Sequence, residues 1–147
     1  MILQKLEKRN YDQMISDTKI PIRIAYTNND GIPNVISLWF VQIDEKIYCA
    51  TQKSAKIVEY LKKNPVCGFE IAADKPPYKG VRGNGSAKII DTMGKDVLQI
   101  LMTKYLGEKE SGLSKFLKKN SPNEVAIEII PQNLFYYDYS TRMKDVF

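Results

Sequence analysis

The segment TQKSAK, which begins at Thr51, gathers residue types that bind anions. It follows an apolar run and opens a helical pattern over 54–63, in which Ser54 is the expected N-cap. The first amides of a helix have no partner within the helix, and the helix dipole makes that end positive. Those amides, the Lys53 and Lys56 amines and the neighbouring hydroxyls favour a phosphate site. Ordinary solvated lysines are the alternative interpretation.

The most informative feature of the composition is the absence of histidine from the 147 residues. This absence excludes Ser-His-Asp and Cys-His catalysis and removes the commonest zinc ligand, so we expect no metal site. Any redox or transfer chemistry would therefore depend on a bound cofactor. The net charge of +5 is spread along the chain, which indicates a solvated basic surface. A basic nucleic-acid-binding barrel stays as a minor alternative.

The chain lacks the apolar segments that direct proteins to membranes or out of the cell. No apolar run approaches the roughly 20 residues that a membrane helix needs, and the first residues lack the apolar stretch of a signal peptide. We therefore expect a cytoplasmic protein. Cys49 and Cys67 lie in apolar, strand-like runs, which predicts two buried free thiols rather than a disulfide.

Apolar periodicity and turn signals predict a single domain over residues 1–147. The expected helices cover 3–17, 54–63, 92–106 and 113–119, and the expected strands cover 22–27, 34–43, 46–51, 66–72, 124–130 and 133–139. The segment 81–91, VRGNGSAKIID, is either a hairpin or one strand with a glycine kink. Six or seven strands joined mostly by hairpins favour a small antiparallel barrel with attached helices.

The run 35–41 is apolar on both faces apart from Ser37. A strand with this pattern is covered on both sides. We expect the barrel core on one side and a helix or a partner subunit on the other.

The stretch DGIPNVISLWFVQIDEKIYCATQKSAKIVEYLKKNPVCGFEI resembles the pyridoxamine-phosphate-oxidase-like flavin-binding split barrels. PPYKGVRGNGSAKII resembles the next long strand of that family, and the similarity covers about residues 20 to 91 well. It implies a mainly β (α+β) fold: a six-stranded antiparallel split β-barrel of Greek key topology with peripheral helices. It also implies a homodimer with two flavin sites at the interface.

The resemblance also implies where FMN would bind. Its phosphate would lie at the helix start, held by Lys56 with Thr51 and Ser54 as neighbours. The isoalloxazine ring would lie along the strand from Val35 to Trp39, approached by the start of the next long strand. The implied cofactor-binding residues are Val35, Ile36, Ser37, Leu38, Trp39, Ala50, Thr51, Lys53, Ser54, Lys56, Lys79, Gly80 and Arg82.

The expected function is that of an FMN-dependent oxidoreductase acting on an unknown small molecule, with the deazaflavin F420 as an alternative cofactor. The other interpretation is a non-catalytic carrier of flavin, F420 or haem. No residue stands out as a catalytic acid or base, although Tyr78 and Lys79 lie near the expected ring edge. True pyridoxamine phosphate oxidases resemble this chain only in the barrel. They also carry a C-terminal substrate segment with arginine and histidine, so vitamin B6 is not the expected substrate.

Overall fold

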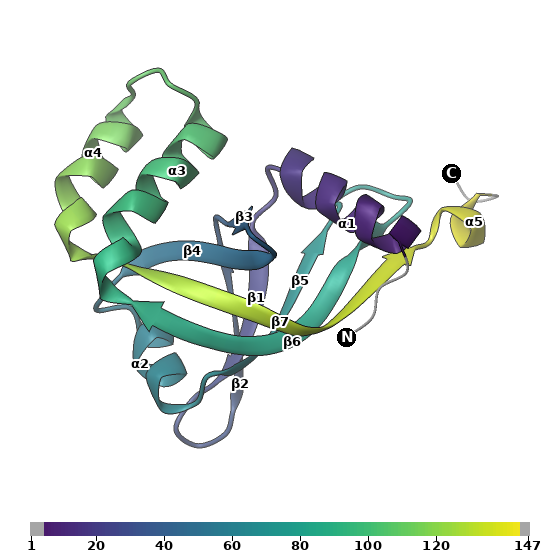
Figure 1. Ribbon diagram of the computed structural model, residues 1–147, viewed down its shortest axis with the longest axis horizontal. Coiled ribbons are helices and arrows are strands. Elements are labelled where there is room, and N and C mark those ends of the chain that lie inside the picture. The colour runs from purple at the N-terminus through teal and green to yellow at the C-terminus, as the bar shows by residue number, and fades with distance from the viewer. Residues whose placement is uncertain (1–4, 145–147) are drawn as a thin grey trace.

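The structure, a computed structural model, describes residues 5–144 and contains one seven-stranded antiparallel sheet, whose strands follow the order β2-β1-β5-β6-β7-β4-β3 (Figure 1). The strands are β1 (Ile22–Thr27), β2 (Pro33–Leu38), β3 (Val41–Ile43), β4 (Lys46–Gln52), β5 (Val66–Ala72), β6 (Lys79–Ile90) and β7 (Glu124–Asp138). The helices are α1 (Lys5–Asp17), α2 (Lys56–Lys63), α3 (Gly94–Leu106), α4 (Gly112–Asn120) and α5 (Ser140–Met143), with short 3-10 turns at Asp91–Met93 and Ser121–Asn123.

The mainly β class is confirmed, but the prediction of six strands is wrong, and the sheet does not close into a ring. The expected strand 34–43 is divided into β2 and β3. Between them the chain turns at Trp39 and Phe40, and Phe40 enters the barrel interior with no exposed surface. A purely local pattern could not distinguish this corner from a continuous strand.

The sheet is longest at β6 and β7, which pair along almost their whole lengths. The ambiguous segment 81–91 belongs to the single strand β6, and the two expected closing strands are the continuous strand β7. A register shift next to Asn84 and Gly85 accommodates an extra residue of β7. Gly85 permits the close approach, because a Cβ there would lie 2.2 Å from the Ile130 carbonyl oxygen. The Asn-Gly pair therefore marks a bulge instead of a hairpin turn.

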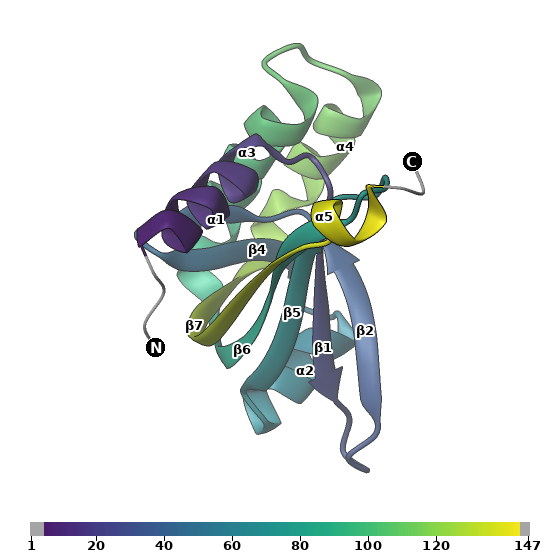
Figure 2. The same cartoon turned by 90° about the vertical axis from the view of Figure 1, so that its right-hand side faces the viewer.

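Two clusters of buried side chains hold the elements together. The larger fills the barrel interior, where α1 and α2 close opposite ends of the curved sheet (Figures 1 and 2). The smaller lies on the other face of β4 and β7, where α3 covers Tyr48 and Ala126 with Val97 and Leu101. The outer face of β4 and β7 is thus covered by a helix.

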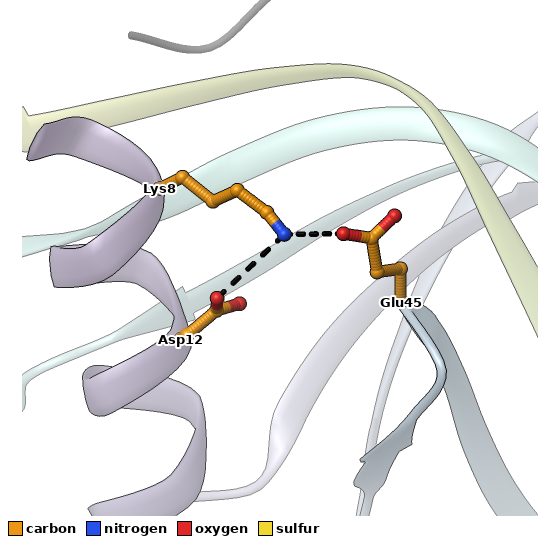
Figure 3. A network of polar contacts seen from close by, with 3 residues as sticks. All are labelled: Lys8, Asp12 and Glu45. Carbon is orange, nitrogen blue, oxygen red and sulfur yellow. Dashed lines mark hydrogen bonds and ion pairs between the residues drawn. The ribbon is translucent and has the colours of Figure 1, made fainter. Parts of the chain in front are cut away.

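A surface ion-pair network joins α1 to the turn between β3 and β4 (Figure 3). The Lys8 amine bonds to Glu45 and lies 3.8 Å from Asp12. The hydrogen bond to Glu45, followed by the charge of Asp12, raises the pKa of Lys8. Because these side chains are exposed, we expect the network to orient α1 more than to stabilise it.

The two cysteines are free and buried, as the sequence predicts. Burial raises the pKa of both thiols, that of Cys67 to about 11. Since only the thiolate reacts, native protein should react with a disulfide reagent at less than about 1% of the rate of an unfolded control. Timed thiol titration with and without urea measures this. One fast-reacting thiol per chain under native conditions would contradict the packing described here.

Across the described part of the chain, no helix combines the length and apolar character needed to cross a membrane.

Candidate functional site

The helix α2 has a different N-cap residue from the one that the sequence predicts. α2 begins at Lys56, and Ala55 occupies the N-cap position with extended backbone and no side-chain cap, so the prediction that Ser54 caps the helix is wrong. Ser54 lies exposed in the preceding turn, which is closed by a 2.9 Å bond from the Ala55 amide to the Gln52 carbonyl. The start of α2 therefore has a backbone hydrogen bond in the preceding turn and no side-chain cap.

Lys56 does reach solvent at the first position of α2, but it has a neighbour of opposite charge. Its amine lies 3.6 Å from Glu59, which is also 3.6 Å from the Lys63 amine. The buried face of the helix, Ile57, Val58 and Leu61, turns these charged groups outward. An anion at this end would compete with Glu59 for Lys56, while Glu59 itself offsets the helix dipole.

The expected ring-binding strand β2 forms one edge of the sheet and presents two kinds of side chain. Val35 and Ser37 are exposed, Val35 by 69%, whereas Ile36 and Leu38 pack against the barrel interior. Only alternate residues of the predicted set are therefore open to a ligand. Trp39 is half-buried and stacks on Tyr105 of α3, with the ring centroids 4.9 Å apart and the planes 5° from parallel.

The residues predicted from β6 have distinct surroundings. Gly80 is buried, and a Cβ there would lie 2.6 Å from the Ile71 carbonyl oxygen. The Arg82 guanidinium is exposed and lies 4.8 Å from the centre of the Phe135 ring and 5.5 Å from that of Tyr137. Lys79 borders a groove of about 370 Å³ beside α1. Arg82 is thus the predicted β6 side chain best placed to meet a ligand.

Tyr78 and the predicted residues in and after β4 differ in their accessibility. Tyr78 is 42% exposed, and its carbonyl accepts a 2.9 Å bond from the Tyr139 amide. Ala50 packs against the smaller cluster under α3, and Thr51 is half-buried. Lys53 is exposed, and its amide donates to the Asn123 carbonyl at 2.8 Å.

Within one chain, the predicted residues do not form one site. The sheet order places β1 and β5 between β2 and β6, and the register runs from Ser37 through Arg23 and Glu70 to Arg82. At roughly 4.8 Å per strand, Ser37 and Arg82 are about 14 Å apart along the sheet. The predicted ring contacts from β2 and from β6 are therefore separate groups on the same face.

Beyond the part of β4 and β7 that α3 covers, this face of the sheet carries exposed and partly apolar side chains and is called the outer face below. The strand register places four exposed apolar side chains from three strands on it: Val35 of β2, Val66 of β5, and Ile130 and Phe135 of β7. The exposed Tyr137–Glu70 hydrogen bond, 2.9 Å long, lies on the same face next to Arg82. Several exposed large apolar side chains on one face of a sheet are typical of an interaction site.

The sequence analysis missed the cluster of Glu70, Arg82, Phe135 and Tyr137. Alternation along each strand would have shown that each side chain points outward. The register of β5, β6 and β7 brings these side chains together, and the bulge changes the register between β6 and β7. A hollow of about 490 Å³ borders this cluster at Arg82, Asn84, Asn133 and Phe135.

Among residues 5–144, no group of three or more histidine, cysteine, aspartate or glutamate side chains is placed to hold a metal ion.

No family model and no curated protein matches the sequence. Among solved structures, one described as an F420 reductase is 16% identical, with a TM-score of 0.73 over 91% of this chain and 98% of that one. A putative pyridoxamine 5'-phosphate oxidase from Listeria innocua is also 16% identical, with a TM-score of 0.68 over 90% and 98%. The heme storage protein HutZ from Vibrio cholerae is 18% identical, with a TM-score of 0.66 over 92% and 95%.

These similarities establish the fold. The chain shares its fold with these structures, so the mainly β architecture with peripheral helices that the resemblance implies is confirmed, whereas its six strands are not. The neighbours' descriptions name different cofactors, so the shared fold by itself does not select one.

Proposed function

We propose that this protein binds a flavin, with FMN as the cofactor, and acts as an oxidoreductase in the form of a homodimer. The observation that carries the proposal is the exposed outer face, where Phe135 lies beside Arg82 and further exposed apolar side chains extend to the edge strand β2. The shared fold with an F420 reductase and a putative pyridoxamine 5'-phosphate oxidase supports a flavin-type cofactor.

A second copy of the chain on the outer face would bring the predicted residues of β2 and β6 together across the interface. In a two-fold interface, residue i of one copy meets residue j of the other, and the reverse contact also forms. Arg82 of one copy could then approach Val35 and Ser37 of the other. The same arrangement would bury the exposed Val66 and Phe135 side chains, which lie on the same face. Each dimer would contain two equivalent sites.

The groups of this chain fit the parts of FMN. As an edge strand, β2 has backbone amides and carbonyls without a neighbouring strand on one side, and these suit the polar edge of a ring. The Lys53 and Lys56 amines are exposed beside the start of α2 and suit a phosphate. Bound flavin would supply hydride transfer, while these groups bind and orient it.

The phosphate part of the proposal predicts that Lys56→Ala weakens FMN binding. A hydrogen bond to a charged group contributes about 1.5–3 kcal/mol, so we expect roughly a 10- to 100-fold rise in the dissociation constant. Flavin fluorescence titration measures it. Lys62→Ala, on the last turn of the same helix, is the matched control and should leave the affinity unchanged.

Glu59→Gln should have the opposite effect on FMN binding, because it removes the carboxylate that competes for Lys56. We expect FMN affinity to rise a few-fold. Wild-type protein without FMN affinity would exclude the flavin assignment. If wild type and Lys56→Ala bind FMN with equal affinity, the phosphate does not bind at the start of α2.

A carrier without turnover is the second candidate function, and the shared fold with a heme storage protein favours testing it. The absorbance spectrum of purified protein distinguishes flavin, F420 and haem. An oxidoreductase should then reduce its bound flavin with NADH or NADPH and reoxidise it with an added acceptor. Binding without sustained turnover would favour the carrier.

A further inference from the structure

The corner between β2 and β3 is fixed by the last turn of α3. Trp39 and Phe40 form this corner, and they separate the edge strand β2 from β3. Tyr105 contacts both corner residues. Its ring stacks on Trp39, and its hydroxyl accepts a 3.3 Å bond from the Phe40 amide and lies 3.5 Å from the Phe40 carbonyl oxygen.

Lys104 holds the same carbonyl from the neighbouring position. Its amine donates to the Phe40 carbonyl oxygen at 2.8 Å and lies 4.0 Å from the centre of the Phe40 ring. The amine is also 5.1 Å from the centre of the Tyr105 ring. Lys19, which follows α1, donates to the Lys104 backbone carbonyl. Side chains and backbone thus join α3, the corner and the end of α1.

The half-buried Lys104 amine has no ion-pair partner among the described residues. Burial, followed by the charge of Lys19, lowers its pKa to about 8, and the buried Cys49 is a weaker influence in the opposite direction. Tyr105 is the other titratable group at the corner, and burial raises its pKa. The groups that stabilise the Lys104 ammonium are therefore the Phe40 carbonyl and two aromatic rings.

We propose that Lys104 and Tyr105 are positioning residues, which fix the Trp39–Phe40 corner and thereby orient β2 for the flavin ring. The inference rests on the proposed function for the identity of the ligand. The Phe40 carbonyl, the Phe40 amide and the Trp39 ring are all held by two adjacent residues of α3, and Leu38 of β2 precedes them directly. Pairing with β1 holds β2 along its length, so release of the corner would act mainly on the adjoining end of β2, at Ser37 and Leu38.

Trp39 is the only tryptophan, so its fluorescence reports directly on the corner. The variants are Tyr105→Leu, which removes the stacked ring, and Lys104→Met, which removes the ammonium. Both should shift Trp39 emission and lower its anisotropy in protein without cofactor. Both should weaken FMN binding about tenfold, as expected when a binding group is no longer pre-organised. Lys56→Ala, in contrast, should weaken binding without changing Trp39 emission.

The charge of Lys104 adds a pH signature that a purely structural role would not give. Because burial lowers the pKa of Lys104 to about 8, wild-type Trp39 emission should titrate with a midpoint near pH 8, and Lys104→Met should lose this step. Lys104→Arg keeps the charge because arginine does not deprotonate in this range. Lys104→Arg should therefore bind FMN more tightly than Lys104→Met at pH 7, and its Trp39 emission should also lack the change near pH 8.

The outcomes separate the two proposals. Wild type without FMN affinity would overturn the proposed function and this assignment together. FMN binding by wild type, with unchanged affinity in folded Tyr105→Leu and Lys104→Met, would overturn the positioning role alone. Thermal unfolding confirms that each variant is folded at the temperature of the titration.

Discussion

Gly94→Ala should destabilise the protein by about 3 kcal/mol or more, since it forces a methyl group into the backbone of β7. A Cβ at this position would lie 2.0 Å from the Glu124 carbonyl oxygen and 2.6 Å from the Val125 Cα. These backbone atoms cannot move freely, because Glu124 and Val125 pair with Gln52 and Thr51 of β4. The helical backbone at Gly94 suits alanine, so space alone opposes the substitution.

The matched control is Gly112→Ala, which changes the first residue of another helix, α4. No atom lies within 4 Å of a Cβ at this position. Alanine favours the helix and restricts the unfolded chain, so we expect a gain of about 0.5–1 kcal/mol. Urea unfolding of both variants gives the free energies. Similar losses in the two variants would show that α3 is not pressed against β7.

Phe135→Asp should convert the proposed dimer into a monomer. Phe135 is 56% exposed on the outer face, and the proposed interface would bury it in both copies. Burying such a side chain contributes about 2–3 kcal/mol, and two-fold symmetry doubles the effect of each substitution. An unpaired carboxylate adds a further penalty, so we expect dimer dissociation to become at least about 100-fold easier.

Phe116→Asp is the matched control, because Phe116 is 61% exposed but lies on α4. Sedimentation equilibrium should find that it preserves the dimer, while Phe135→Asp lowers both dimerisation and FMN affinity. A wild-type monomer that binds FMN fully would contradict the composite site. Dissociation caused by Phe116→Asp alone would place the interface on α4.

The sequence predicts best the elements whose apolar pattern is simple. The strands 22–27 and 66–72 coincide with β1 and β5, where alternate side chains enter the barrel. The corner at Trp39 and Phe40 is different, because Phe40 is buried and Trp39 is half-buried against distant parts of the chain. Pro131 also reads as a strand end, yet it lies beside the bulge within β7, where the ladder tolerates proline.

The candidate site depends still more on long-range geometry. That Lys56 faces solvent follows from the apolar spacing of α2, whereas its pairing with Glu59 was not anticipated. The row of Ser37, Arg23, Glu70 and Arg82 requires the register of four strands. Local patterns give the direction of each side chain, and only the paired sheet shows which side chains share a surface.

The place of β7 in the sheet also constrains the order of events during protein synthesis. β7 alone joins β4 and β3 to the other four strands, and its partners in β4 lie some 70 to 80 residues earlier in the chain. On the ribosome, the apolar β4 segment must therefore wait for residues 124–130 before its free edge is paired. Such delayed, long-range pairing slows folding and leaves strand edges exposed to aggregation. Pausing of translation before Glu124 should therefore increase the dependence of the nascent chain on chaperones.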